Sequence, residues 1–166
     1  QLFNMYGITE TTVHVTCHPV TLDQIPDNNI IGRPVADLEV WVLDAYLQCV
    51  PIGVSGEMYV SGAGVTCGYL NRPELTGERF IIVEIFGKYR CLYKTGDRAR
   101  WLSEGNLEYL GRLDHQIKLR GFRIELGEIE ATLRQHEAVL EAVVVLYSKE
   151  DDKRIIAYVT KNNEQL

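Results

Sequence analysis

Short runs in which apolar and polar residues alternate dominate the first 110 positions of the chain. β-branched and aromatic residues are frequent in these runs, which favours strands, and glycine, proline and asparagine separate them as turns do. A series of short strands of this kind is typical of a barrel-like β unit. The pattern predicts strands at residues 12–16, 38–47, 57–61, 80–83 and 92–95, and a hairpin that joins 100–102 to 107–110.

Two segments depart from this alternation. Residues 21–34 are polar and contain Pro26 and Pro34, so we expect a loop there. Residues 71–79 suit a short helix, with Asn71 as its candidate cap and Pro73 in its first turn.

The pattern changes near residue 113. Leu126, Ile129 and Leu133 recur with helical spacing and predict an amphipathic helix of about three turns. Alternating or apolar runs surround this helix and predict strands at residues 116–120, 122–124, 139–146 and 155–159, the first two separated by Gly121.

These elements predict the fold class α+β. A β-rich, distorted barrel-like unit at residues 1–113 is expected to precede a small α+β unit at residues 114–166, with the joint near Asp114. A length of 166 residues is enough for one ordinary domain, or two small ones, with a real core.

Composition and charge indicate which kinds of binding partner and cellular setting to expect. Hydrophobic residues make up 46% and charged residues 24% of the chain, which is the balance of a globular protein. The net charge of −6 argues against a general nucleic-acid-binding surface, and no apolar run approaches the ~20 residues of a membrane helix. None of the four cysteines lie two or three residues apart, so we expect reduced thiols in a cytoplasmic protein and no zinc knuckle. The chain opens at Gln1 without an initiator methionine or a signal peptide, and we expect a cut inside a longer protein.

Residues 4–10 combine side chains that suit a nucleotide. The ring of Tyr6 can stack on a base, and Gly7 lets the backbone approach a ligand closely. The hydroxyl of Thr9 can bond a phosphate, and the carboxylate of Glu10 can hold Mg²⁺. On spacing alone, a polar loop around a buried tyrosine is the competing interpretation.

Three further segments contain glycine. Asp97 follows Gly96 at the end of a predicted strand, where a carboxylate can accept hydrogen bonds from both ribose hydroxyls or simply lie in an exposed turn. Residues 56–69 miss the dinucleotide fingerprint because the third glycine comes one residue too late, so these glycines are interpreted as bulges or turns. The sequence contains no Walker-type phosphate loop. Residues 111–130 carry five basic groups, His115 included, which suit either a phosphate-facing hinge or a solvated surface hairpin.

Taken in this order, the four segments resemble the adenylate-forming enzymes, and among them the amino-acid adenylation domains of nonribosomal peptide synthetases. The resemblance runs from Asn4 to about Glu130, and the tail to residue 160 is consistent with it. The run from Gln116 to Glu125 is its most specific part and is much closer to peptide synthetases than to acyl-CoA ligases. Ile8 departs from the family, which usually has proline there; this changes the stiffness of the loop and removes no functional group.

The resemblance implies a reaction and a set of roles. Such domains convert an amino acid and MgATP into aminoacyl-AMP and pyrophosphate, and then load the acyl group onto the phosphopantetheine thiol of a carrier domain among flanking synthetase domains. Positioning and charge neutralisation are the main demands of this chemistry. By the resemblance, Asn4, Tyr6 and Gly7 would lie at the adenine, Asp97 would bind the ribose, and Tyr109 would lie near the nucleotide. Thr9 would contact the α-phosphate, Glu10 would hold Mg²⁺, and Arg112 would reach the ribose or phosphate. Asp114 would be the hinge of a mobile C-terminal subdomain.

The amino-acid pocket is partly covered by the same resemblance. Met5, Val13 and His14 take the positions that line it in this family, and the trio is similar to that of threonine-activating domains. Met5 and Val13 would pack on a methyl group and His14 would bond a hydroxyl, although His14 is equally compatible with an ordinary strand position. Other catalytic parts of the family fall outside residues 1–166, so we expect these residues alone to be inactive.

Three alternatives stay open at this point. An acyl-CoA ligase would keep adenylate formation and change the acid. A non-catalytic module would dock a carrier protein without nucleotide chemistry. A plain β-rich binding domain would make all four segment matches accidental.

Overall fold

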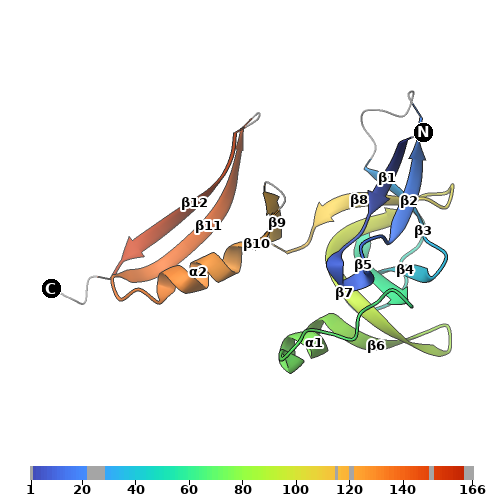
Figure 1. Ribbon diagram of the computed structural model, residues 1–166, viewed down its shortest axis with the longest axis horizontal. Coiled ribbons are helices and arrows are strands. Elements are labelled where there is room, and N and C mark those ends of the chain that lie inside the picture. The colour runs from blue at the N-terminus through green and yellow to red at the C-terminus, as the bar shows by residue number, and fades with distance from the viewer. Residues whose placement is uncertain (1, 22–28, 115, 120–121, 150–151, 163–166) are drawn as a thin grey trace. The chain divides into compact units, whose positions relative to one another are not determined.

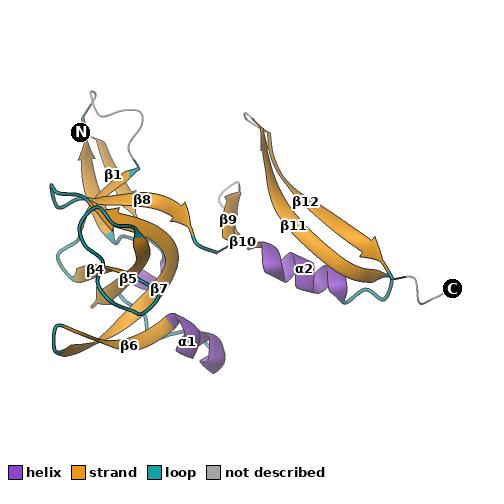
Figure 2. Ribbon diagram, turned by 180° about the vertical axis from the view of Figure 1, so that it is seen from behind, coloured by secondary structure: helices purple, strands orange, loops and turns teal. Residues whose placement is uncertain are grey.

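The computed structural model describes residues 2–21, 29–114, 116–119, 122–149 and 152–162. The chain divides into two compact units, Gln1–Leu113 and Asp114–Leu166. Strands make up most of both units, as Figures 1 and 2 show, and helices are few. The α+β fold class predicted from the sequence is confirmed.

One antiparallel sheet organises the first unit. Its strands follow the order β1-β2-β3-β8-β7-β5-β4, with β6 also paired to β7. Among the described strands this path does not close on itself, so the sheet is open rather than a complete barrel. The elements are β1 (Leu2–Tyr6), the 3₁₀ turn η1 (Thr9–Thr11), β2 (Thr16–Val20), β3 (Ile30–Pro34), β4 (Leu38–Leu43), β5 (Gly56–Gly62), α1 (Pro73–Arg79), β6 (Phe80–Ile85), β7 (Lys88–Trp101) and β8 (Leu107–Arg112).

The alternation along β4 and β5 separates two apolar cores. Val40 and Val60 lie opposite each other in the sheet and point into the larger core, while Leu43 and Tyr59 belong to a smaller one. Successive side chains of a strand point to opposite faces, so each strand contributes to both cores. The larger core consists of Val15, Ile31, Leu38, Val40, Val42, Met58, Val60, Ala99 and Leu107; the smaller consists of Leu43, Tyr59, Val83, Ile85 and Leu92.

Strand β7 joins most of this sheet together. It is 14 residues long and pairs with β6, β5 and β8. Gly96 lies in the middle of it with a φ of +74°, and the register against β8 shifts between Asp97 and Ala99. An irregularity of this kind bends a strand and redirects its side chains. Asp97 is consequently buried directly after the bend.

The segment between β1 and β2 differs from the prediction. The strand expected at 12–16 is wrong, because β2 begins only at Thr16 and the residues before it form a tight turn. Thr12 and Val13 have φ values of 58° and 74°, in the left-handed region that β-branched residues rarely occupy. Several main-chain bonds hold this turn; among them, the amide of Val15 donates to the carbonyl of Tyr6 at 2.8 Å, and that of Val13 to the carbonyl of Ile8 at 3.2 Å.

Two smaller expectations are also wrong. Part of the loop expected at 21–34 is strand β3, because Ile31 is buried and the strand finds partners in both β2 and β8; residues 22–28 of that loop lie outside the described part. Arg72, not Asn71, caps α1, and its side chain makes no cap bond; Pro73 occupies the first turn as expected. The strands predicted between residues 38 and 110 correspond to β4 to β8, although β4 ends at Leu43 rather than at residue 47 and β7 ends at Trp101.

The second unit consists of two hairpins and a helix. Hairpin β9 (Gln116–Leu119) with β10 (Phe122–Glu125) leads into α2 (Leu126–Arg134), which packs on β11 (Val139–Lys149), paired in turn with β12 (Asp152–Lys161). The amide of Val144 donates to the Glu130 carboxylate at 2.8 Å and ties the helix to β11. These elements agree with the predicted ones; Gly121 lies outside the described residues.

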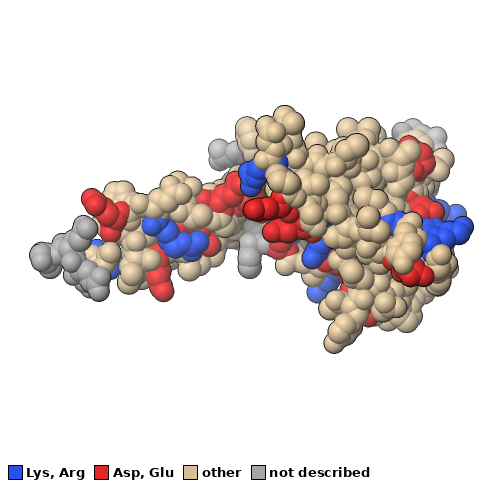
Figure 3. All heavy atoms as spheres, turned by 90° about the horizontal axis from the view of Figure 1, so that it is seen from below, with Lys and Arg blue, Asp and Glu red and all other residues tan. Residues whose placement is uncertain are grey.

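Charges are distributed without a strong bias on the face that Figure 3 displays. Acidic and basic side chains are interspersed there among uncharged ones. Over the described residues, no helix has the length and apolar character needed to cross a membrane.

Candidate functional site

Four residues singled out separately in the sequence meet in one cluster of the first unit. Tyr6 at the end of β1 donates its phenolic proton to Oδ2 of Asp97 on β7. Arg112, at the end of β8, donates from Nη1 to Oδ1 of the same carboxylate at 3.1 Å. The ring of Tyr109, also on β8, lies 6.0 Å from the ring of Tyr6 at an angle of 35°. A carboxylate, a guanidinium and two aromatic rings are thereby held together by three strands.

The two charged side chains of this cluster are largely buried. The side chain of Asp97 is 3% exposed and that of Arg112 is 18% exposed, so their ion pair is shielded from water. Burial, followed by the charge of Asp97 and the hydrogen bond to it, raises the pKa of Tyr6 far above its ordinary value. The phenol therefore stays protonated and remains a donor at any physiological pH. Tyr6 and Tyr109 both pack against the larger apolar core, which fixes their rings.

Hydrogen bonds from the main-chain amides of Gly96 and Asp97 to nearby side chains set the position of Asp97. Its amide donates to Oγ1 of Thr95 at 3.0 Å, and that hydroxyl donates to the carbonyl of Met58 on β5 at 2.6 Å. The amide of Gly96 donates to the carboxylate of Glu57 at 3.2 Å. The bend in β7 is thus stabilised from β5, and the carboxylate of Asp97 has a defined direction.

Glu10 forms a second cluster that the sequence did not reveal. It lies in η1, is 7% exposed, and accepts a hydrogen bond at Oε1 from the hydroxyl of Tyr69 at 2.6 Å. The hydroxyl of Tyr69 also lies 3.3 Å from that of Tyr93. Sequence reasoning missed both tyrosines, because Tyr69 ends a glycine-rich segment interpreted as turns and Tyr93 reads as an ordinary strand residue.

The remaining predicted nucleotide-binding residues lie on β1 and in the turn that follows it. The side-chain amide of Asn4 donates to the carbonyl of Ile30 at 2.7 Å and ties β1 to β3. Thr9 is exposed at the start of η1. Gly7 lies against the backbone of Val13, where a Cβ atom would come within 1.6 Å of the carbonyl oxygen.

The three residues predicted to line the amino-acid pocket are all solvent-exposed. Met5 on β1 is 40% exposed and Val13 in the tight turn is 61% exposed, and His14 follows it. Asp114, the residue predicted to act as a hinge, belongs to the second unit, where its Oδ1 accepts from the amide of Gln116 at 3.2 Å.

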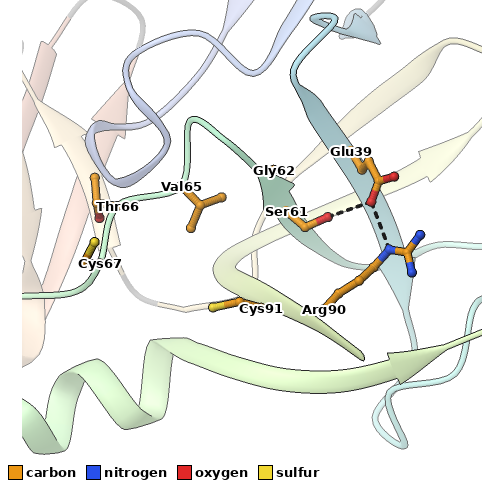
Figure 4. A pocket seen from close by; sticks show the side chains of 8 residues that line it. All are labelled: Glu39, Ser61, Gly62, Val65, Thr66, Cys67, Arg90 and Cys91. Atoms are coloured by element: carbon orange, nitrogen blue, oxygen red, sulfur yellow. Dashed lines mark hydrogen bonds and ion pairs between the residues drawn. The ribbon is translucent and has the colours of Figure 1, made fainter. Parts of the chain in front are cut away.

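A separate hollow of about 400 Å³ lies beside β5 and β7. Figure 4 shows Ser61 and Arg90 directed at the carboxylate of Glu39, which they bond at 3.1 and 2.9 Å. Arg90 also stacks on Trp41, 4.8 Å from the ring centroid. No residue assigned to a site from the sequence lines this hollow. Its lining consists of Glu39, Ser61, Gly62, Val65, Thr66, Cys67, Arg90 and Cys91.

The carboxylate of Glu10 is the kind of oxygen ligand that the Mg²⁺ expected from the resemblance would require. Within the described residues no group of three histidine, cysteine or acidic side chains is close enough to hold a metal by itself. Mg²⁺ prefers oxygen ligands and is usually bound through one or two carboxylates together with substrate phosphates. One buried, oriented carboxylate satisfies the protein's part of that requirement.

Known proteins resemble this chain over nearly its whole length. The family described as AMP-binding enzyme matches residues 1–70. The dimodular nonribosomal peptide synthase of Bacillus subtilis (strain 168) is 53% identical over 169 residues, which cover 99% of this chain and 7% of that protein. PA1221, a solved NRPS protein containing adenylation and PCP domains, matches with a TM-score of 0.82 and 32% identity over 97% of this chain and 33% of its own.

A second solved structure agrees. A four-domain nonribosomal peptide synthetase bound to AMP and glycine is 40% identical, with a TM-score of 0.62, over 97% of this chain and 12% of its own. The chain therefore spans a small part of each relative, and the resemblance seen in the sequence is confirmed. Residues 1–70 match the AMP-binding enzymes, and the chain as a whole is similar to nonribosomal peptide synthetases that contain adenylation domains.

Proposed function

We propose that the protein containing this chain activates an amino acid with MgATP. The carboxylate of the amino acid attacks the α-phosphorus, the bond from that phosphorus to the bridging oxygen of pyrophosphate breaks, and aminoacyl-AMP and pyrophosphate result. The observation that carries this proposal is the convergence of Tyr6, Asp97, Tyr109 and Arg112. A buried carboxylate beside aromatic rings and a guanidinium offers acceptors for ribose hydroxyls, surfaces for a base and a charge for phosphate.

Each residue of the cluster then has a role in binding the nucleotide. Asp97 accepts from the ribose hydroxyls, since its two oxygens offer about four acceptor sites, of which Tyr6 and Arg112 each occupy one. Tyr6, with Asn4 and Gly7, faces the adenine, and Tyr109 lies close by. Arg112 binds the ribose or phosphate, while its pairing with Asp97 keeps both side chains oriented before the nucleotide arrives. Orientation of this kind lowers the entropic cost of reaching the transition state.

The loop between β1 and β2 supplies the residues that bind the phosphate end of ATP. Thr9 donates its hydroxyl to the α-phosphate, and Glu10 holds Mg²⁺. The metal, when bound, neutralises phosphate charge as the pyrophosphate leaves. The exposed position of Thr9 and the buried, hydrogen-bonded carboxylate of Glu10 support these different roles.

The second half-reaction transfers the aminoacyl group to the phosphopantetheine thiol of a carrier domain. The thiol sulfur attacks the acyl carbon, and AMP leaves with the electron pair of the broken acyl–phosphate bond. We place Asp114 at the hinge between the unit at 1–113 and a mobile unit that begins at 114, supported by the division of the chain there. The PCP domains in the solved relative support a carrier partner, beside flanking synthetase domains. Because the chain spans a third of that relative, we expect residues 1–166 alone to be inactive.

Threonine is the proposed amino acid. Met5 and Val13 would contact its methyl group, and His14 would bond its hydroxyl. All three belong to the segment that also carries Thr9 and Glu10, and all are accessible from solvent. A pocket that bonds a hydroxyl discriminates strongly against substrates without one.

Amino-acid-dependent ATP–pyrophosphate exchange on the full adenylation domain, with each of the twenty amino acids, tests both the proposed reaction and the proposed amino acid. A single strong response to threonine supports the reaction and the pocket. Faster exchange with valine or another amino acid keeps the reaction and overturns the pocket assignment. No exchange with any of them would overturn the reaction and point to another acid or a non-catalytic module.

Asp97→Asn tests the nucleotide cluster in the same assay. The neutral amide keeps the shape but weakens acceptance from ribose and from Arg112, so kcat/KM for ATP should fall about 10- to 100-fold, the worth of a hydrogen bond to a charged group. Asp44→Asn is the matched control, because Oδ1 of Asp44 accepts from the main-chain amides of Tyr46 and Gln48 in an exposed turn. Equal effects of the two variants would contradict the assigned role.

A further inference from the structure

Tyr69 is held rigidly in the loop that joins β5 to α1. Its amide donates to Oγ1 of Thr76 at 2.9 Å, and its ring meets Phe80 edge-on at 5.5 Å. Its hydroxyl donates to Oε1 of Glu10 at 2.6 Å, from 59 residues away in the sequence. Both the main chain and the ring of Tyr69 are therefore fixed independently of the contact with Glu10.

The proton on this hydroxyl has a defined place. A phenol has an ordinary pKa of about 10, so the hydroxyl of Tyr69 carries its proton at neutral pH, and it lies 2.6 Å from Oε1 of Glu10. An ionised carboxylate only accepts hydrogen bonds, so the single phenolic proton of Tyr69 points at Glu10. Tyr93 is then the donor in its 3.3 Å contact with Tyr69, and the two tyrosines form a chain of donors that ends on the carboxylate.

The contact is not needed to hold the two loops together. The amide of Thr66 donates to the carbonyl of Glu10 at 2.9 Å, and Oγ1 of Thr12 donates to the carbonyl of Gly64 at 2.7 Å. These two bonds already attach the β5–α1 loop to the η1 turn. The hydroxyl of Tyr69 bonds the side chain of Glu10 rather than its main chain, and so it orients the carboxylate.

We propose that Tyr69 is a positioning residue for divalent-metal binding at Glu10, an inference that rests on the metal-holding role proposed above for that carboxylate. Hydrogen-bond partners behind a metal-binding side chain fix its orientation, and their loss typically costs about 10- to 100-fold in metal affinity. Tyr69 itself touches neither the substrate nor the metal. It acts through Glu10, and the effect of losing its hydroxyl is specific to the metal-dependent part of nucleotide binding.

The experiment compares Tyr69→Phe, Tyr59→Phe and Glu10→Gln in the full adenylation domain. Tyr59 donates to Oε2 of Glu57 at 3.0 Å, so Tyr59→Phe removes the same kind of bond from a carboxylate with no proposed metal. Binding of Mn²⁺ in the presence of a non-hydrolysable ATP analogue is followed by electron paramagnetic resonance, and metal-free AMP binding by calorimetry. The Mg²⁺ concentration for half-maximal exchange is the third measurement.

Tyr69→Phe should weaken Mn²⁺ binding and raise the half-maximal Mg²⁺ concentration by about 10-fold, with AMP affinity unchanged within about twofold. Tyr59→Phe should change neither metal measurement. Equal metal dependence in Tyr69→Phe and Tyr59→Phe overturns the inference, as does a loss of AMP binding that matches the loss of metal binding, since that pattern means a merely structural role.

Glu10→Gln separates this inference from the proposal beneath it. If Glu10→Gln shifts the metal dependence and Tyr69→Phe does not, only the role of Tyr69 fails. If Glu10→Gln leaves the metal dependence unchanged, the metal-holding role of Glu10 fails and the role of Tyr69 falls with it.

Discussion

Gly7→Ala should disrupt the turn that carries Thr9 and Glu10. A Cβ atom at position 7 would lie 1.6 Å from the carbonyl oxygen of Val13, 2.6 Å from its carbonyl carbon and 2.8 Å from Cα of His14. All three contacts are with backbone, so no side-chain rotation relieves them. Real Cβ contacts essentially never fall under 3.0 Å, and the turn must move by about 1.4 Å to restore that distance.

A shift of this size breaks the main-chain bonds that close the turn. The amide of Val13 donates to Ile8 at 3.2 Å, as does that of Thr11, and the amide of Val15 donates to Tyr6 at 2.8 Å. Each such bond contributes roughly 0.5–1.5 kcal/mol net, so the loss of two or three lowers the free energy of unfolding by about 1–4.5 kcal/mol. Because Glu10 moves with the turn, amino-acid-dependent exchange should also fall.

Urea unfolding of the adenylation domain measures the global effect, and hydrogen exchange at the amides of Val13 and Val15 measures the local one. Gly77→Ala is the matched control, because Gly77 lies within α1 and a Cβ there meets nothing within 4 Å. That variant should be neutral or more stable by about 0.5–1 kcal/mol, since alanine favours helix over glycine. If Gly7→Ala unfolds like the wild type and its two amides stay equally protected, the reasoning about this turn is wrong.

Two further predictions concern the sheet. Thr95→Val removes the hydroxyl that bonds the buried carbonyl of Met58 and the amide of Asp97, and should lower the free energy of unfolding in urea by about 2–4 kcal/mol. Thr95→Ser keeps this hydroxyl and should lower it by about 1 kcal/mol. Equal losses in the two variants would refute this reasoning. The hydrogen bond from Arg90 lowers the pKa of Glu39 below its ordinary value, so Glu39 stabilises the fold above that ordinary value, and this contribution disappears as the pH falls through the lowered pKa. Glu39→Gln should therefore cost about 0.5 kcal/mol at pH 7, a small figure because the side chain of Glu39 is 54% exposed, and this cost should shrink as the pH falls below the ordinary pKa of glutamate; a difference that persists in acid would count against the ion pair as its cause.

Much of the candidate site was predictable because its residues carry distinctive chemistry in distinctive order. Tyr6, Asp97, Tyr109 and Arg112 were each named from the sequence, through the resemblance to a family whose motifs lie in that order. Tyr69 was not, because a tyrosine after a glycine-rich turn has no pattern that distinguishes a hydrogen-bond donor from a packed ring. Its partner is 59 residues away, and only the folded loop brings them within 2.6 Å.

The failed strand at residues 12–16 has a similar cause. β-branched residues favour extended backbone locally, yet Thr12 and Val13 have positive φ in a turn closed by bonds from Val13 to Ile8 and from Val15 to Tyr6, with Gly7 packed against Val13. Tertiary contacts overrode the local preference, which is worth less than the bonds that oppose it.

The sequence by itself determined the strand periodicity of β4 to β8, the helix α2 and the change of character near residue 113. These features depend on which face of each segment is apolar, and that information is local. The tertiary structure alone decided the open order of the sheet, the bend at Gly96 and the meeting of Tyr6 with Asp97, which are 91 residues apart. Such contacts depend on register and on how turns close between distant strands, and the alternation of apolar and polar residues is the same for many registers.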